Sequence, residues 1–285
     1  MGAGGLTLVS WNCAGGVRDK WPKLLDRINL DVAILTECSS LPTAVLRDPS
    51  REVTQVVRRP VADARHAKHI GVFARAPWKV EEVQHSELLP WLVHARVTDG
   101  QGKFGAFDVL AVWGLSSHYA GELGYAEQTR AVIERVLAKL PTEYPVVLAG
   151  DLNTPIDSNK SDALVHDGNV ALLRELDLLS AFSAYFLGTP AAKKPTHYWR
   201  WKKDQAFHID HVFVPFGWCD RHGFSMGIGT FEDWVATRIS DHVPLVVNVP
   251  GPRAPQRKTW TDLLKGRNGP GVRGGTPTRG VSPQG

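Results

Sequence analysis

Cysteine is scarce in this sequence. The three cysteines, Cys13, Cys38 and Cys219, are odd in number, lie far apart and form no CxxC motif. This pattern excludes a disulfide framework and a cysteine-based zinc site, and it favours a reducing compartment. The sequence also shows no signal peptide in its first residues and no apolar run long enough to cross a bilayer. We therefore expect a cytoplasmic protein that does not insert into membranes.

Three widespread catalytic motifs are missing as well. The sequence contains no GxSxG nucleophile motif, no P-loop and no HExxH zinc motif. A serine or cysteine nucleophile is therefore not indicated, and neither is a nucleotide cradle of the P-loop kind.

A net positive charge is also missing from most of the chain, although the 285 residues together carry a net charge of +4. Residues 251–285 contain seven Lys/Arg and one Asp, which leaves 26 basic and 28 acidic residues in residues 1–250. We predict a catalytic domain over residues 1–250 and a basic, Gly- and Pro-rich tail over residues 251–285 that is disordered. The charge of the tail does not by itself make the domain a nucleic-acid binder.

The most informative stretch is Val146–Pro155. Its apolar residues predict a buried strand that ends at Gly150, where glycine allows a sharp turn or a close approach of backbone. Asp151 and Asn153 follow two residues apart, so they share a face at the carboxyl end of a strand, where open α/β sheets bind ligands. The alternative is a strand followed by an ordinary Asx turn at Asn153.

Other strands and helices are expected before and after this stretch. The pattern predicts a strand–helix–strand unit over residues 6–35, with polar Asn12 and Glu37 directly after its two strands. Alternation in several later strands favours antiparallel pairing. The further predicted strands are 70–74, 79–83, 91–97, 107–113, 208–214 and 245–249, and the further predicted helices are 41–47, 126–140 and 169–176.

Polar side chains at the ends of the predicted strands form a set with one chemistry in common. Carboxylates and amide oxygens are hard ligands that suit Mg²⁺ or Mn²⁺, and a histidine beside a carboxylate can be held ready to move a proton. The set therefore favours metal-assisted phosphoryl transfer. Its members are Asn12, Glu37, His118, Asp151, Asn153, Asp210, Asp241 and His242.

The ordered set resembles the endonuclease/exonuclease/phosphatase superfamily, the deoxyribonuclease-I-like hydrolases. The matching segments are SWNCAGG (10–16), ILTEC (34–38), SSHY (116–119), LAGDLNT (148–154), HIDHVFV (208–214) and ISDHVPL (239–245). Each is weak alone, but six in the family's order are specific. The resemblance implies an α/β (α+β) fold, a four-layer sandwich of two packed mixed β-sheets flanked by helices.

The resemblance also implies metal-binding roles. Glu37 would be a direct ligand of Mg²⁺ or Mn²⁺, and Asn12 and Asp241 would lie at the metal. Asp151 would hold or activate the attacking water and could touch the metal too. A solvated position at a sheet edge for Glu37, and a strand cap for Asp241, are the alternatives from the residues alone.

Catalytic roles follow from the same resemblance. Asn153 would bind phosphate, and His118 would stabilise the charged phosphorus centre, although it lies in a Ser-Ser-His context where many relatives have Asn-Thr-His. His242 would contact a phosphate oxygen or act as acid or base, oriented by Asp210. The neighbouring His211 points to the opposite face of its strand and is interpreted as structural.

Two segments favour nucleic acid as the substrate. The basic stretch 58–69 contains Arg65 and His69, and the stretch 196–203 places Arg200, Trp201 and Lys202 together, which suits phosphate contacts and base stacking. The alternative is that these aromatic residues pack beneath the loop.

These observations predict a metal-dependent phosphodiesterase, an endonuclease that works by direct attack of water. A phosphatase for a small phosphorylated molecule is the alternative, and a non-catalytic binding module is a third. Residues 218–221 (WCDR) resemble a motif of inositol-polyphosphate 5-phosphatases, and we interpret them as a coincidence because Asp210 already fills the corresponding place.

Overall fold

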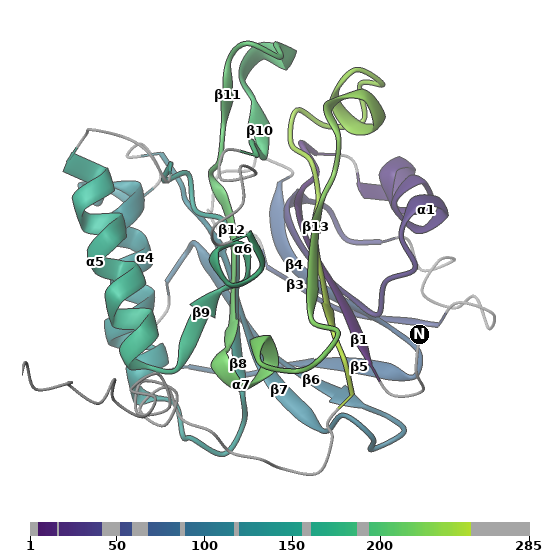
Figure 1. Ribbon diagram of the computed structural model, residues 1–285, viewed down its shortest axis with the longest axis vertical. Coiled ribbons are helices and arrows are strands. Elements are labelled where there is room, and N and C mark those ends of the chain that lie inside the picture. The colour runs from purple at the N-terminus through teal and green to yellow at the C-terminus, as the bar shows by residue number, and fades with distance from the viewer. Residues whose placement is uncertain are drawn as a thin grey trace, which may run out of the picture.

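In a computed structural model, the chain forms two six-stranded β-sheets that pack face to face between helices (Figure 1). The structure describes residues 5–15, 17–41, 52–58, 68–85, 89–116, 120–155, 161–186 and 194–251. The strand orders are β13-β14-β1-β2-β4-β3 and β5-β6-β7-β8-β12-β9. This is the four-layer α/β sandwich that the sequence predicted.

The elements have the following bounds. The first sheet contains β1 (Leu6–Asn12), β2 (Val32–Cys38), β3 (Val53–Arg58), β4 (His69–Arg75), β13 (Ser225–Ile228) and β14 (Leu245–Val249). The second contains β5 (Trp78–Glu82), β6 (Leu92–Asp99), β7 (Ala106–Trp113), β8 (Val146–Asp151), β9 (Leu178–Ser180) and β12 (Asp210–Pro215). The helices are α1 (Val17–Arg27), α4 (Tyr125–Arg135), α5 (Ser161–Glu175), α6 (Ala181–Phe186) and α7 (Phe216–Cys219). A separate hairpin, β10 (His197–Tyr198) and β11 (Ala206–Phe207), carries the 3₁₀ turn η2 (Trp199–Trp201).

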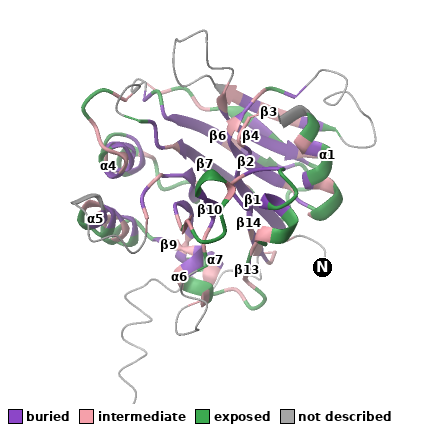
Figure 2. Cartoon of the chain, turned by 90° about the horizontal axis from the view of Figure 1, so that it is seen from above, coloured by how far each residue is buried: buried purple, intermediate pink, exposed green. Residues whose placement is uncertain are grey.

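The core follows from the alternation of side chains along the strands. Leu8 of β1 faces the second sheet and packs in a cluster with Val109 and Val212. Its neighbour Val9 points to the other side, where α1 covers the first sheet. Helices α4 and α5 cover the second sheet in the same way (Figures 1 and 2). Each sheet is therefore buried on both faces, which explains strands as apolar as β1 and β8.

The predicted strand–helix–strand unit is confirmed, because β1 and β2 pair in parallel across α1. Antiparallel pairing is confirmed for β5–β6 and β6–β7. Strand β3, which the sequence analysis did not predict, also pairs antiparallel with β4. The helix predicted over 169–176 is too short: α5 begins at Ser161, and its start was hidden by Gly168 and by a weak apolar stripe. The helix predicted over 126–140 is too long, because α4 ends at Arg135 with Val136 as its C-cap (φ −116°) and a 3₁₀ turn, Leu137–Lys139, follows. The predicted helix 41–47, except Leu41, and the predicted tail beyond Gly251 lie outside the described residues.

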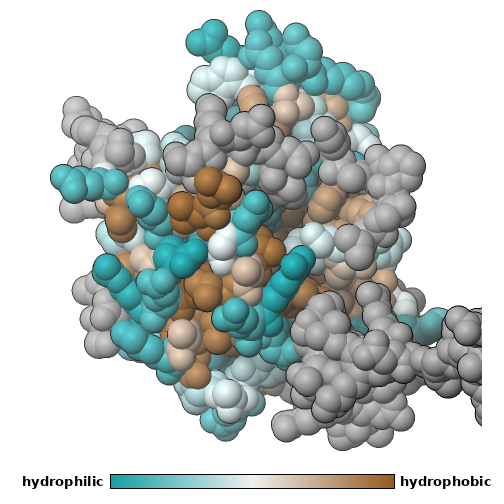
Figure 3. Space-filling view, turned by 60° about the vertical axis from the view of Figure 1, so that its left-hand side comes forward, coloured by the Kyte–Doolittle hydropathy of each residue, from teal (hydrophilic) through white to brown (hydrophobic). Residues whose placement is uncertain are grey.

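None of the described helices combines the length and hydrophobicity needed to span a membrane. Figure 3 shows the side of the molecule on which α4 and α5 lie, where hydrophobic surface is mixed with hydrophilic side chains. The exposed large apolar side chains of the described residues are Leu164, Leu176, Tyr185, Trp199 and Phe207.

Candidate functional site

The site is built on the end of β8, and Gly150 allows β8 to approach the neighbouring strand closely there. This glycine has φ +142°, and a Cβ at its position would lie 1.9 Å from the backbone oxygen of Val112 on the parallel strand β7. No other residue fits there, so the predicted close approach of backbone is confirmed. On the other side, β12 pairs antiparallel with β8 and sets Asp210 directly opposite Asp151. Two carboxylates therefore stand side by side at one end of the second sheet.

Asp151 is only 2% exposed and is held by amide groups. Asn12, at the end of β1 in the other sheet, donates its Nδ2 to Asp151 Oδ2 at 2.8 Å. Asn153 donates its backbone N–H to Asp151 Oδ1 at 3.0 Å and its Nδ2 to Asp151 Oδ2 at 3.3 Å. Asn153 reaches this position with a left-handed backbone (φ +53°), which asparagine tolerates better than most residues. The structure thus brings together three residues that the sequence placed at strand ends.

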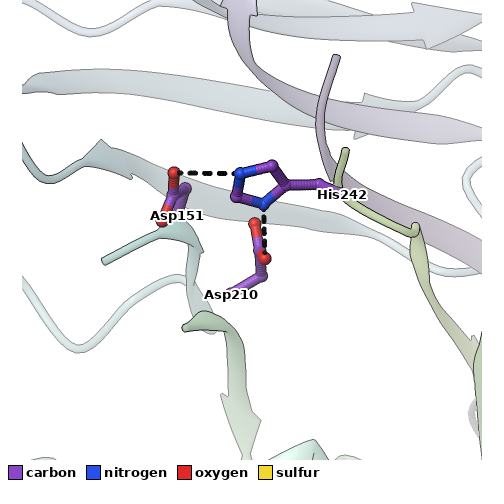
Figure 4. A group of neighbouring side chains, drawn as sticks. All are labelled: Asp151, Asp210 and His242. Atoms are coloured by element: carbon purple, nitrogen blue, oxygen red, sulfur yellow. Dashed lines mark hydrogen bonds and ion pairs between the residues drawn. The ribbon is translucent and has the colours of Figure 1, made fainter. Parts of the chain in front are cut away.

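A histidine joins this pair from the far end of the chain. His242 Nδ1 lies 2.8 Å from Asp210 Oδ2, and His242 Nε2 lies 4.0 Å from Asp151 Oδ2 (Figure 4). All three side chains are buried. Asp210 accepts the Nδ1 proton, so the Nε2 edge of the imidazole is the one that faces Asp151. The other oxygen of Asp210, Oδ1, is buried without a hydrogen-bond partner among the described residues.

Burial and mutual charge shift the pKa values of this group. Burial, followed by the negative charge of Asp210, raises the pKa of the Asp151 carboxyl to about 7. Burial alone would lower the pKa of His242, but the charge and hydrogen bond of Asp210, with the charge of Asp151, raise it to about 9. Between these values Asp151 is ionised while His242 is protonated. The site therefore holds a buried ion pair at neutral to mildly alkaline pH.

Glu37 and Asp241 bring further negative charge to the site. Glu37 lies within an irregularity in the pairing of β2 with β4, between Leu35 and Cys38, and has a left-handed backbone (φ +51°). Its carboxylate forms an ion pair with Lys68, and its charge acts on Asp151. Lys20 of α1 carries positive charge that interacts with Asp241 and Glu37. Sequence reasoning missed both lysines, since neither lies in a motif.

The donor set fits a hard divalent cation. Four carboxylates carry negative charge at the site, those of Glu37, Asp151, Asp210 and Asp241. Their charges act on one another and on the imidazoles of His197 and His242. Burial and then the charges of Asp210 and Glu37 raise the pKa of Asp151, and one buried oxygen of Asp210 has no partner among the described residues. Ligand atoms of Asp151, Asp210 and His242 lie within 4.8 Å of one another. Because His242 is already bonded to Asp210, we regard the oxygens of Glu37, Asp241, Asn12 and Asp151 as the better ligands for Mg²⁺ or Mn²⁺.

Two histidines behind the site fix the loop after β8. His211 Nε2 lies 2.9 Å from the backbone oxygen of Thr154, and His166 Nδ1 lies 3.1 Å from the Thr154 hydroxyl. Both histidines are buried, and burial lowers the pKa of each. They therefore support the loop as neutral rings, and His211 has the structural place expected from its face of the strand.

Sequence reasoning did not select His197, which lies directly on the site. Its ring stacks on His242 with centroids 4.3 Å apart, and its Nε2 lies 3.9 Å from Asp241 Oδ2. The signal in the sequence was its position in the PTHYW stretch, between the aromatic residues that form the hairpin. Its pairing with His242 depends on a tertiary contact between segments 45 residues apart, so spacing alone could not find it.

The hairpin β10–β11 stands beside the site and projects from the body (Figure 1). It exposes Trp199 (52%) and Phe207 (47%), and Arg200 and Lys202 are exposed at its turn. Trp201, which the sequence favoured, is half-buried beneath Arg238. The exposed tryptophan of this stretch is Trp199.

The remaining predicted residues have different outcomes. His69 begins β4 and pairs with Cys38, the neighbour of Glu37. His118 and Arg65 lie outside the described residues. The WCDR stretch lies at the end of β12 remote from Asp210, and its Trp218 is buried between the sheets. Its position supports the interpretation as a coincidence.

Comparisons with known proteins give a consistent result. The model of the Endonuclease/Exonuclease/phosphatase family matches residues 9–242. No curated protein matches this sequence. A Neisseria structure of the 3′ phosphatase NExo bound to a product DNA hairpin is similar, with TM-score 0.63 and 14% identity over 86% of this chain and 99% of that chain. An AP endonuclease from Archaeoglobus fulgidus has TM-score 0.61 and 15% identity over 85% and 98% of the two chains. At these identities the structural likeness establishes the fold alone.

Proposed function

Because the chain belongs to the endonuclease/exonuclease/phosphatase family of phosphate-ester hydrolases, we propose that it is a divalent-metal-dependent nuclease. It cleaves phosphodiester bonds of nucleic acid by direct attack of water, without a covalent enzyme intermediate. The described site supports this through buried Asp151 and His242, which form an acid–base pair beside oxygen ligands for a metal.

Asp151 is the group that orients and deprotonates the attacking water. In the metal-free protein, burial and then the charge of Asp210 raise its pKa to about 7, so the carboxylate can accept a proton near neutral pH, and the amides of Asn12 and Asn153 fix it. A bound Mg²⁺ or Mn²⁺, held by Glu37, Asp241 and Asn12, would neutralise charge on the phosphate. We place Asn153 as a donor to a phosphate oxygen as well.

His242 is the cationic partner of the reaction. With a pKa of about 9 it is an imidazolium at neutral pH, and Asp210 holds its Nδ1 so that Nε2 stays free to donate. A proton donor at this place stabilises negative charge on the phosphorus centre and can protonate a leaving oxygen. Asp210 is thus an orienting group, and His118 is proposed to act on the same charge.

The nucleic-acid substrate is supported by the hairpin. Trp199 and Phe207 present aromatic faces to solvent next to the site, with Arg200 and Lys202 at the turn between them. Exposed rings interleaved with cations suit stacked bases and phosphates. From the sequence, we propose His69, Arg65 and Trp201 as further substrate-binding residues.

A small phosphate ester is the second candidate, and one observation favours it. Residues 1–250 carry 26 basic and 28 acidic residues, so the domain lacks the positive field typical of nucleic-acid enzymes.

Nicking of supercoiled plasmid with Mg²⁺ or Mn²⁺, with and without EDTA, tests the proposal. We expect metal-dependent nicking that His242→Ala abolishes while the circular dichroism spectrum stays native. Trp199→Ala should raise the KM for single-stranded DNA by about 5- to 100-fold, from the usual value of a stacked base. Tyr185→Ala is the matched control, since Tyr185 is similarly exposed (45%) but lies on α6. No nicking by a folded protein, with turnover of nucleotides or sugar phosphates, would instead establish the second candidate.

A further inference from the structure

His197 and its neighbour Thr196 touch both members of the Asp210–His242 pair. The Thr196 hydroxyl accepts hydrogen bonds from the backbone N–H groups of Ile209 and Asp210, each at 3.1 Å. This fixes the start of β12, from which Asp210 projects. The next residue, His197, lies against His242. The first strand of the hairpin is therefore fastened to the site at two consecutive positions.

A short antiparallel ladder sets the two histidines face to face. Val243 N donates to Thr196 O, and Tyr198 N donates to Asp241 O, both at 2.8 Å. His197 and His242 are thus directly opposite each other in a pair without hydrogen bonds of its own, the arrangement in which side chains approach most closely. Their rings stack at 4.3 Å with an angle of 29°.

The contacts of the His197 ring point to a task beyond packing. The ring is 9% exposed, and its Nε2 lies 3.9 Å from Asp241 Oδ2. Its Nδ1 is buried without a hydrogen-bond partner among the described residues. Burial, followed by the charge of His242, lowers the pKa of His197, so the ring is neutral; it is held by its face against His242, and its Nε2 edge faces Asp241. A histidine that served the core alone would have both nitrogens satisfied or would be replaced by an apolar ring without loss.

We propose that His197 is a positioning residue of the site, which orients the Asp241 carboxylate through Nε2 and holds the plane of the His242 imidazole through its ring face. The proposal rests on the proposed hydrolytic site. It assigns two separable tasks to one side chain: Nε2 serves the metal ligand, and the ring serves the acid–base group.

Two substitutions separate these tasks. His197→Phe keeps a ring against His242 and removes Nε2, whereas His197→Gln keeps an N–H donor near Asp241 and removes the ring. Mn²⁺ affinity is measured by electron paramagnetic resonance on substrate-free protein. The His242 imidazole is followed by ¹⁵N NMR, and turnover is measured with bis(4-nitrophenyl) phosphate. His222→Phe, at an exposed position between α7 and β13, is the matched control.

We expect the variants to lose different properties. His197→Phe should bind Mn²⁺ about tenfold more weakly, the usual effect of removing a group that supports a metal ligand, with His242 resonances close to wild type. His197→Gln should keep Mn²⁺ affinity within about threefold, shift the His242 resonances and lower kcat by about 10- to 100-fold through misplacement of the imidazole. A structural role would instead lower thermal stability in both variants and change both readouts together, which would overturn the proposal.

The unmodified protein supplies an independent check. Adding Mg²⁺ should move the His197 Nε2 resonance, because Asp241 would then bind the ion; an unmoved resonance with Mg²⁺ bound would contradict the proposal. None of these readouts needs nucleic acid. A protein that fails to nick plasmid but shows the split between variants would overturn the proposed substrate and leave the role of His197 in place.

Discussion

Replacing Asp151 with asparagine should make the metal-free protein more stable relative to wild type as the pH rises. Burial and the charge of Asp210 raise the pKa of this carboxyl from 3.8 to about 7 in the folded protein. A raised pKa means that the folded state binds the proton more tightly than the unfolded chain does. The stability from that proton is complete below pH ~4 and is lost as the pH rises through about 7.

The size of the effect follows from the pKa difference. Each pKa unit corresponds to about 1.4 kcal/mol, so ionised Asp151 costs the fold on the order of 4 kcal/mol above pH 7. Between pH 5 and pH 8 the free energy of unfolding of wild type should fall by about 2–3 kcal/mol relative to Asp151→Asn. His242 remains protonated over most of this range, because its pKa is about 9.

Urea denaturation in EDTA at several pH values measures this difference. The informative quantity is the slope with pH, because the lost hydrogen bonds from Asn12 and Asn153 add an offset that does not depend on pH. Adding Mg²⁺ should flatten the slope for wild type, since a cation favours the ionised carboxylate. A difference in the free energy of unfolding that stays constant with pH, or that changes in the opposite direction, would refute the assignment of Asp151 as a buried carboxylate whose ionisation destabilises the fold.

Three further changes have definite expected outcomes. His242→Gln should abolish turnover, and wild-type kcat/KM should fall above about pH 9 as the imidazolium loses its proton; a pH profile flat to pH 10 would contradict that role. Lys68→Met should raise Mn²⁺ affinity, because Lys68 competes with the metal for Glu37. The expected gain is up to about fivefold, the energy of a partly exposed ion pair, and unchanged binding in a titration would show that the pair does not affect the metal. Gly150→Ala should destabilise the fold by at least about 3 kcal/mol, since the alanine Cβ would lie 1.9 Å from the backbone oxygen of Val112. Near-normal thermal stability would instead mean that β7 and β8 can separate at this point.

Much of the site could be predicted because its residues stand at the ends of buried strands. Asn12 and Asp151 stand where an apolar run ends, Asp210 stands where one begins, and strand pairing brings such positions to one edge. The packing of the two sheets then determines the distances between these side chains, and no local sequence pattern encodes those distances. Glu37 was selected correctly as a strand-end residue, but its left-handed backbone and its pairing with Lys68 depend on how β4 returns along β2.

What sequence reasoning missed depends on tertiary contact. His197 lies in a stretch whose aromatic and basic residues suggested a substrate surface, and its stacking on His242 needs the backbone ladder between two distant segments. The early part of α5 was missed for a different reason. Its apolar residues do not form a clear stripe, so periodicity had little to detect before Gly168.

The distance along the chain between Asn12 and His242 has a consequence for synthesis. β1 is made first, but one of its neighbours is β14, and the Trp11 indole donates to the backbone oxygen of His242 at 3.1 Å. The ribosome must therefore release almost the whole domain before Asp151 meets its imidazole partner. A nascent or prematurely terminated chain has no complete site, so the hydrolase would stay inactive until the segment around His242 has left the ribosome and packed against β1.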